Sequence, residues 1–184
     1  AVAAGKAEGA AFATLASGPV AAQLVRVFRL GERNRHDSGI DDAAAATARE
    51  ITRPAVVGAG IMGSGIAASH LRAGFSLTLC DVQAQTLSGS VAGILDEAAW
   101  DRATKRTDPA RALALAGRLH TSTHLAALSD ADLVIEAIYE DMGAKKEVFA
   151  KLDVLARPGV VLASNTSTLD IDAIASATKR PELV

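Results

Sequence analysis

The sequence predicts an α/β fold with a doubly wound, mainly parallel sheet, preceded by a helical linker segment. From residue 53 onward, short apolar runs alternate with segments of helical periodicity. The first run ends in Gly58-Ala59-Gly60-Ile61-Met62-Gly63, and a helical segment starts inside that pattern. The second run ends in an acidic residue, Asp81, roughly 20 residues past the glycines. Strand, glycine turn, helix and second strand in this order indicate a βαβ unit of a parallel sheet.

The first 50 residues differ from the rest, so we divide the chain into a helical or linker segment (1–50) and the α/β domain (51–184). Residues 10–30 have a helical pattern that is interrupted at Ser17-Gly18-Pro19. Their apolar side chains form one stripe, composed of Phe12, Leu15, Leu24, Val27, Phe28 and Leu30. This stripe is expected to dock on the main domain or on a neighbour.

A polar linker is expected between the stripe and the α/β domain. Residues 31–42 are polar and charged, which is typical of a linker, and residues 43–50 are a weakly helical or disordered tract. The chain begins at Ala1 rather than Met and has no signal-peptide pattern, so we expect a fragment of a longer protein.

The first half of the domain is predicted to contain two strands, at 55–57 and 76–80, joined by a crossover helix at 61–72. A long helix is then expected from Gln83 to about Arg106. Its apolar face would consist of Leu87, Val91, Ile94, Leu95 and Trp100.

The second half continues the alternation of helices and strands. Asp108-Pro109 is typical of an N-cap followed by proline at the first helical position, and it opens a helix through Ala116. Further strands are predicted at 119–123, 133–135 and 160–163. Between the last two strands, a helix to about Leu155 is expected to carry Lys145, Lys146 and Glu147 on its polar face.

The glycine pattern predicts a dinucleotide site of the Rossmann type. Gly58 allows the tight turn, Gly60 lets the backbone approach a pyrophosphate, and Gly63 lets the helix pack closely on the sheet. Asp81 would accept hydrogen bonds from the adenosine ribose hydroxyls and repel a 2′-phosphate, and Val82-Gln83-Ala84 supply no cation to neutralise one. The cofactor predicted is NAD rather than NADP. The alternative is a glycine-rich turn that a surface aspartate caps.

Three polar clusters follow predicted strands: Asp81, residues 136–141 and residues 164–168. Each alone is compatible with a turn or a helix cap. Ligands of such sheets bind outside the carboxyl ends of the strands, where all three clusters would meet. Together they indicate a rim for a cofactor and a substrate.

Composition excludes several other classes of protein. The 184-residue chain is 49% hydrophobic with a formal net charge of -2, which argues against nucleic acid as a partner. The apolar stretch at 54–69 is too short and too rich in glycine to span a membrane. Cys80, the single cysteine, is expected to be a buried structural thiol in a reducing compartment, and we predict a cytoplasmic protein. His120 and His124 lack an evident third ligand, so no metal is expected.

The motifs VVGAGIMGSGIA, DLVIEAIYED with KKEVFAKLD, and LASNTSTL resemble in this order the NAD-binding domain of L-3-hydroxyacyl-CoA dehydrogenases. The resemblance runs from Arg53 to the end of the chain. NTST, together with the upstream segment EGAAFATLASGPVAAQLVRVF, resembles the multifunctional alpha subunit of the fatty-acid oxidation complex. That resemblance implies an upstream enoyl-CoA hydratase domain, an oligomeric enzyme and a thiolase partner subunit. The linker departs from the family, because residues 31–36 contain no lysine.

The resemblance implies roles for particular residues. The cofactor would be bound by Gly58, Gly60, Ile61, Met62, Gly63, Asp81, Ala137, Glu140, Lys145 and Asn165. Ser167 matches the catalytic serine that hydrogen-bonds the substrate 3-hydroxyl, with Asn165 beside it. Lys105 and Arg106 would either contact CoA phosphates or form a solvated basic helix end.

The function implied is oxidation of L-3-hydroxyacyl-CoA to 3-oxoacyl-CoA with NAD. The family's catalytic histidine and its glutamate would lie beyond Val184, and neither His36 nor His70 is expected to replace that histidine. The segment is therefore expected to bind NAD without turnover. The alternatives are another β-hydroxyacid dehydrogenase, or a module that senses NAD or acts as a scaffold without catalysis.

Overall fold

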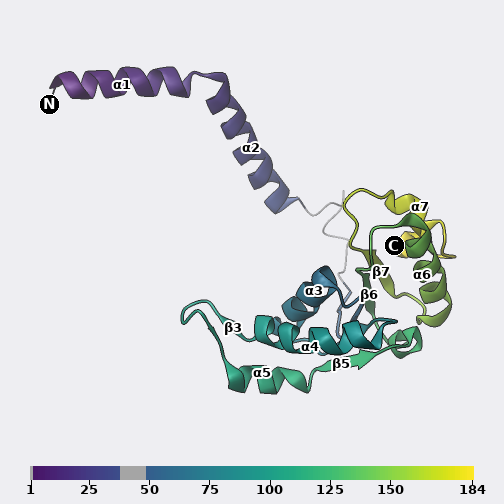
Figure 1. Cartoon of the computed structure of the whole chain (residues 1–184). Coiled ribbons are helices and arrows are strands. Elements are labelled where there is room, and N and C mark those ends of the chain that lie inside the picture. Colours follow the sequence, from purple (N-terminus) through teal and green to yellow (C-terminus); the bar gives the residue numbers. More distant parts are fainter. Residues whose placement is uncertain (1, 38–48) are drawn as a thin grey trace. The chain divides into compact units, whose positions relative to one another are not determined.

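The structure is a computed structural model that describes residues 2–37 and 49–184, and it divides into two units, residues 1–49 and 50–184. In the first unit, α1 (Val2–Ala16) and α2 (Pro19–His36) are separated by a break after which Pro19 opens α2 (Figure 1). The two helices and the break confirm the prediction. The predicted linker at 31–42 is wrong at its start, because α2 continues to His36.

The longer α2 has a local cause. Glu32 and Arg35, one turn apart, form an ion pair at 2.9 Å, and the basic residues of the last turn face the negative end of the helix dipole. The predicted tract at 43–50 lies almost entirely outside the described residues.

The apolar stripe of the first unit is exposed to solvent. Phe12 is 72% exposed and Phe28 is 68% exposed, and α2 contains no buried side chain. Among the helices of the described residues, none is by itself long and apolar enough to cross a membrane. Gly5–Ala16 and Pro19–His36 are long and apolar enough for a membrane span only when they are taken together, and they are bent by 64° at the break between them.

The second unit is built on a parallel sheet of order β5-β2-β1-β6-β7. The strands are β1 (Pro54–Val57), β2 (Leu77–Cys80), β5 (Leu119–Ser122), β6 (Leu133–Glu136) and β7 (Val161–Ser164). All five were predicted within two residues at their ends. The register pairs Val57 with Cys80 and Glu136, and Glu136 with Ser164, so the strand ends form one continuous row.

Helices cover both faces of this sheet, which confirms the doubly wound α/β fold (Figure 1). One core cluster packs α3 (Ile61–Arg72), α4 (Ala84–Ala98) and α5 (Pro109–Ala116) against Val56 and Leu79. The other core cluster packs η1 (Leu125–Leu128), α6 (Met142–Leu155) and α7 (Ile171–Ala175) against Ala55, Val57 and Val134. The short helix η2 (Pro181–Leu183) follows α7.

The predicted helix from Gln83 to Arg106 is wrong beyond Ala98. Strands β3 (Trp100–Asp101) and β4 (Arg106–Thr107) form an antiparallel hairpin there. The carboxylate of Asp101 accepts the N–H groups of Ala103 and Thr104, and Lys105 adopts φ 54°, so the backbone turns back instead of continuing the helix. Trp100 consequently lies outside the helical face and is 45% exposed.

The helix start predicted from the capping residues Asp108 and Pro109 is confirmed, and a second aspartate, which was not predicted as a cap, opens α6 in the same way. The Asp108 carboxylate accepts the N–H groups of Ala110 and Arg111, and Pro109 occupies the first position of α5. Asp141 caps α6 by accepting the N–H of Ala144 at 2.8 Å. These local bonds fix the residue at which each of the two helices begins.

Two glycines of the motif are required by the packing of α3. Gly58 has φ +102°, and a Cβ at this position would lie 2.6 Å from the Ala137 carbonyl oxygen. A Cβ on Gly63 would lie 1.8 Å from the Gly58 carbonyl oxygen. The helix therefore rests directly on the backbone of the turn that precedes it.

We predict that Gly63→Ala lowers the melting temperature of the protein by on the order of 5–10 °C, because overpacking costs about 1–3 kcal/mol and the neighbour is rigid backbone. Gly65→Ala, in the same helix, is the matched control, since a Cβ there meets nothing within 4 Å. Alanine favours a helix interior, so this control should melt at the same temperature or higher. Circular dichroism melts of both variants test the prediction, and equal melting temperatures would contradict it.

Candidate functional site

Four loops meet at the carboxyl ends of the parallel strands. They are the glycine turn after β1, the loop of Asp81 after β2, residues 137–141 after β6 and residues 165–168 after β7. The three polar clusters of the sequence analysis thus lie along one edge of the sheet, as predicted. This is the edge where a topological switch leaves space for ligands, because α3 and α6 leave β1 and β6 toward opposite faces.

The glycine turn presents the N-terminus of α3 to solvent. Gly60 is the N-cap residue, and no side chain caps the helix. Ile61 is 92% exposed, and a Cβ on Gly60 would meet no protein atom within 4 Å. The helix start therefore offers uncapped N–H groups and a partial positive charge to an anion.

Asp81 links the end of β2 to this turn. One carboxylate oxygen accepts the N–H of Ala59 at 2.8 Å, and the other accepts the N–H of Gln83 at 2.8 Å. A carboxylate oxygen has two lone-pair sites, so both oxygens retain acceptor capacity for the hydroxyls of a ligand. The carboxylate is thus held in place beside the α3 N-terminus without being saturated.

Cys80 lies next to Asp81 but points into the core. The residue is fully buried, and burial, with the nearby Asp81 charge as a second cause, raises the pKa of Cys80 to about 11. The side chain therefore remains a neutral thiol at physiological pH. The prediction of a buried structural cysteine is confirmed.

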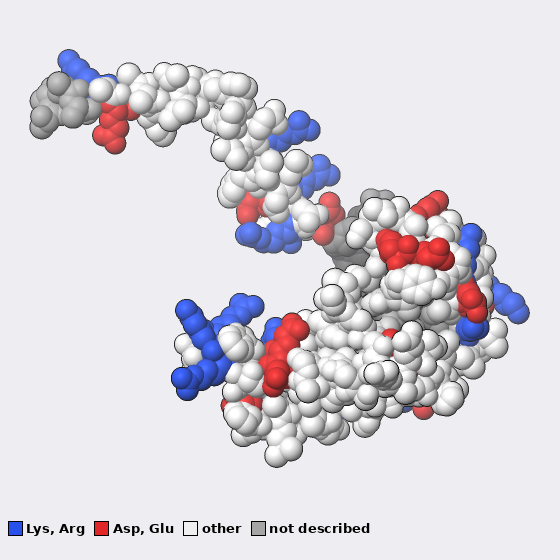
Figure 2. Space-filling model, in the orientation of Figure 1, with Lys and Arg blue, Asp and Glu red and all other residues white. Residues whose placement is uncertain are grey.

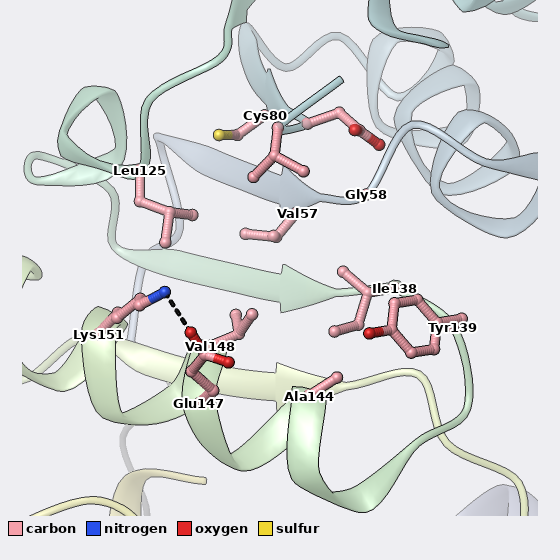
Figure 3. Close-up of a pocket in the computed structure, with 12 residues that line it drawn as sticks. Val57, Gly58, Cys80, Leu125, Ile138, Tyr139, Ala144, Glu147, Val148 and Lys151 are labelled. Atoms are coloured by element: carbon pink, nitrogen blue, oxygen red, sulfur yellow. Dashed lines mark hydrogen bonds and ion pairs between the residues drawn. The ribbon is translucent and has the colours of Figure 1, made fainter. Parts of the chain in front are cut away.

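A cavity of about 220 Å³ opens beside Asp81, on the face of the sheet that α6 covers (Figure 3). Its walls are mainly apolar and include Val57, Val82, Leu125, Ile138, Tyr139 and Val148. At one end, the Lys151 ammonium and the Glu147 carboxylate form an ion pair at 2.6 Å (Figure 3). An apolar slot beside a carboxylate with free acceptor capacity has the character of a site for a flat aromatic ring attached to a polar group.

A fully buried ion pair joins β6 to α6. The Lys145 ammonium lies 2.7 and 2.9 Å from the two carboxylate oxygens of Glu136, and both side chains are 0% exposed. The placement of Lys145 on the polar face of its helix is therefore wrong. Lys145 shares the inward face with Phe149 and Leu152 at the i, i+4, i+7 spacing, which is the signal that reveals its position. A lysine on such a face requires a buried anion.

Glu140 joins the loop after β6 to the loop after β7. One of its oxygens accepts the Thr166 hydroxyl at 2.6 Å and the Ser167 N–H at 3.0 Å, and the other lies 3.4 Å from the Lys145 ammonium. The Thr166 hydroxyl, the Ser167 amide and the Lys145 ammonium hold the pKa of Glu140 at about 2, well below its ordinary value of 4.5. Glu140 therefore stays ionised and holds the backbone of Ser167.

The remaining predicted residues lie around this network. Ala137 is buried, and its N–H donates to the Val57 carbonyl at 2.7 Å. The Asn165 N–H donates to the Glu136 carbonyl at 2.7 Å. Ser167 is exposed at the turn that follows. The structure thus brings Ala137, Glu140, Lys145, Asn165 and Ser167 together, whereas Asp81 lies on the other side of the glycine turn.

Glu136 and Thr166 belong to the polar clusters that the sequence predicted for this edge, but neither was given a role of its own. The sequence carries a signal for Glu136, since this acidic residue directly follows the apolar run Leu133-Val134-Ile135 of a buried strand. The Thr166 bond to Glu140 joins residues 26 positions apart, and no local pattern in the sequence indicates it.

Other candidate residues lie away from these loops. His120 is in β5 and His124 follows it, and β2 and β1 separate β5 from β6. Within residues 2–37 and 49–184, no three His, Cys, Asp or Glu side chains are grouped as metal ligands would be. Lys105 and Arg106 lie in the β3–β4 hairpin, where basic side chains gather (Figure 2), so their interpretation as a helix end is wrong.

We predict a pH-dependent contribution of Glu140 to stability. Its pKa is lowered in the folded state, so the stabilisation is complete above the ordinary value of 4.5 and is lost as the pH falls toward about 2. The melting temperature of Glu140→Gln should therefore be lower than that of the wild type at pH of about 6, and this gap should narrow as the pH falls to about 3. Calorimetric scans across this range test it.

Glu8→Gln in α1 is the control, because it removes an exposed carboxylate in the separate N-terminal unit. Its pH profile should follow that of the wild type. If the difference in melting temperature between Glu140→Gln and the wild type is the same at every pH, the charge of Glu140 does not contribute to stability.

The chain is similar to known dehydrogenases over its second unit. The family model described as 3-hydroxyacyl-CoA dehydrogenase, NAD binding domain, matches residues 53–184. The chain is 42% identical over 139 residues to the peroxisomal bifunctional enzyme of Danio rerio, covering 74% of this chain and 18% of that protein. It is 46% identical over 138 residues to a 3-hydroxybutyryl-CoA dehydrogenase of Mycobacterium tuberculosis, covering 73% and 47%.

Solved structures show the same likeness. The crystal structure of 3-hydroxybutyryl-CoA dehydrogenase from Escherichia coli superimposes with a TM-score of 0.67 at 36% identity, covering 74% of this chain and 29% of that chain. The chain spans less than half the length of the curated relatives named above. With its glycine turn, Asp81 and parallel sheet, the chain belongs to the 3-hydroxyacyl-CoA dehydrogenase family, and residues 53–184 are the NAD-binding domain of that family.

Proposed function

We propose that this domain serves an enzyme that oxidises L-3-hydroxyacyl-CoA to 3-oxoacyl-CoA in fatty-acid β-oxidation, with NAD as the cofactor. The observation that supports it most is the pairing of Asp81 with the glycine turn, through the Ala59 N–H bond at 2.8 Å. This bond holds a hydroxyl acceptor next to an uncapped helix N-terminus. An adenosine ribose and a pyrophosphate require these two groups side by side.

The residues of this edge fit a dinucleotide. The pyrophosphate would lie against the α3 N-terminus, bound by Gly58, Gly60, Ile61, Met62 and Gly63, where the absence of protein atoms near Gly60 leaves room. The adenosine ribose would bind Asp81, with the adenine in the apolar cavity beside it. Ala137, Glu140, Lys145 and Asn165 would surround the nicotinamide end, because they follow β6 and β7 on the far side of the turn.

Ser167 is the residue we propose to act on the substrate. When bound, NAD supplies the hydride acceptor of the reaction. The Ser167 hydroxyl would donate to the substrate 3-hydroxyl oxygen, position it and stabilise the charge that develops there. The Glu140 carboxylate supports this role, since it accepts the Ser167 N–H and holds the turn. Asn165 would contact the same substrate group.

The first unit and the hairpin support further proposals about the intact protein. Residues 1–49 form a unit of their own with an exposed apolar stripe, which fits the trailing helices of an upstream enoyl-CoA hydratase domain in a multifunctional enzyme. We propose that this cytoplasmic enzyme is an oligomer that associates with a thiolase subunit. The exposed Lys105 and Arg106 of the hairpin would contact the CoA phosphates.

We predict that Asp81→Ala weakens NADH binding far more than NADPH binding. The loss of hydrogen bonds to a charged group should cost about 1.5–3 kcal/mol for NADH, whereas NADPH gains from the loss of charge repulsion. Fluorescence titration with both cofactors measures the difference. Asp108→Ala, which also removes a carboxylate that accepts two backbone N–H groups, should leave both affinities unaltered. Equal wild-type affinities for NADH and NADPH would contradict the assignment of NAD to Asp81.

For Ser167 we predict an effect on turnover and little effect on folding. In the intact dehydrogenase, Ser167→Ala should lower kcat by roughly 10²-fold or more, as when a transition-state donor is lost. The melting temperature should remain nearly constant, because the side chain is exposed. Steady-state kinetics with acetoacetyl-CoA and NADH, together with thermal melts, test both parts. Normal kcat with a collapsed melting temperature would identify Ser167 as a structural turn residue instead.

A further inference from the structure

We propose that Glu136 is a positioning residue for the nicotinamide half of the site: it restrains Lys145, and thereby keeps Glu140 bound to the turn that carries Ser167. The inference rests on the proposed function, because it concerns the cofactor end assigned to these loops. Glu136 itself is 0% exposed and would not touch the cofactor.

Glu136 connects three elements through one carboxylate. It ends β6, and its oxygens accept bonds from the Ile138 N–H at 2.7 Å, the Lys145 ammonium of α6 at 2.7 Å and the Ser164 hydroxyl of β7 at 2.6 Å. No buried side-chain nitrogen or oxygen in the described parts of the chain lacks a partner. The three donors around Glu136 are therefore all paired with its carboxylate, and a neutral side chain at this position would leave the Lys145 ammonium without its main anion.

The ammonium of Lys145 lies between two carboxylates. It is 2.7 Å from Glu136 and 3.4 Å from Glu140. A buried ammonium that loses its main anion moves toward the next one, because an unpaired buried charge is very costly. Without the charge of Glu136, Lys145 would therefore attract Glu140. That attraction competes with the bonds that Glu140 accepts from Thr166 and Ser167, so the turn would lose its restraint.

The adenosine half of the site does not depend on this network. Asp81 is held by the N–H groups of Ala59 and Gln83, and it follows β2, which β1 separates from β6. Removing the charge of Glu136 should therefore weaken the binding of the nicotinamide end of the dinucleotide and leave the binding of the adenosine end unchanged. A loss of folding would affect both.

The experiment compares ADP with NADH on the full chain by isothermal titration calorimetry. Glu136→Gln keeps the size of the side chain and removes its charge. We expect the affinity for NADH to fall about 10-fold or more, the range for a lost bond to a charged group, while the affinity for ADP stays within about twofold of wild type.

Asp132→Asn is the matched control. Asp132 is a buried carboxylate directly before the other end of β6, where it accepts the N–H groups of Thr52 and Arg53. This variant removes a comparable buried charge far from the nicotinamide loops. It should bind both ligands as the wild type does.

A second variant covers the case in which Glu136→Gln does not fold. Ser164→Ala removes one donor to Glu136 and keeps the ion pair with Lys145, so it should show the same NADH-specific loss to a smaller degree. Wild type that binds neither ligand would overturn the proposed function itself. The role of Glu136 alone would be overturned if the wild type binds both ligands and a folded Glu136→Gln binds NADH as tightly as the wild type does. It would also be overturned if this variant loses affinity for ADP as much as for NADH. If Glu136→Gln is unfolded, an unaltered Ser164→Ala overturns it.

Discussion

The buried contact between Glu136 and Lys145 is the interaction on which this edge of the protein depends. Taking two charges out of water is costly, and it is compensated only when the geometry is good and further hydrogen bonds satisfy both groups. Here the Ile138 N–H and the Ser164 hydroxyl complete the environment of the carboxylate. The start of α6 and the ends of β6 and β7 are thereby held at one point, from which the loops that contain Glu140 and Ser167 extend.

A second constraint organises the other half of the edge. Gly63 brings α3 against the carbonyl of Gly58, and Gly58 itself lies against the carbonyl of Ala137. The Ala137 N–H in turn donates to Val57. Close backbone contacts therefore connect the turn after β1 to the loop after β6, so these two loops share one rigid centre.

The sequence was sufficient to predict those features that depend on residues close together along the chain. The N-cap of α5 at Asp108, the helix break at Ser17-Gly18-Pro19 and the apolar strand runs depend on neighbouring residues, and the structure confirms all of them. The glycine spacing and Asp81 likewise identified the βαβ unit, because the turn geometry admits few residue types. The helical periodicity gave a wrong prediction beyond Ala98, where the chain forms a hairpin. The strands of this hairpin have two residues each, which is too short for an alternating pattern to be recognised in the sequence.

What the sequence by itself determined was the order of the five strands of the sheet and of the longer helices between them, the place of the glycine turn and the polar character of the strand ends. Only the tertiary structure decided that Lys145 is buried on Glu136, and that Glu140 binds the turn of Thr166 and Ser167. Both contacts join elements that are distant along the chain or depend on which helix face meets the sheet. The identity of a charged residue does not show whether its side chain faces the sheet or the solvent. Its partner is determined by how the helices and strands pack in three dimensions.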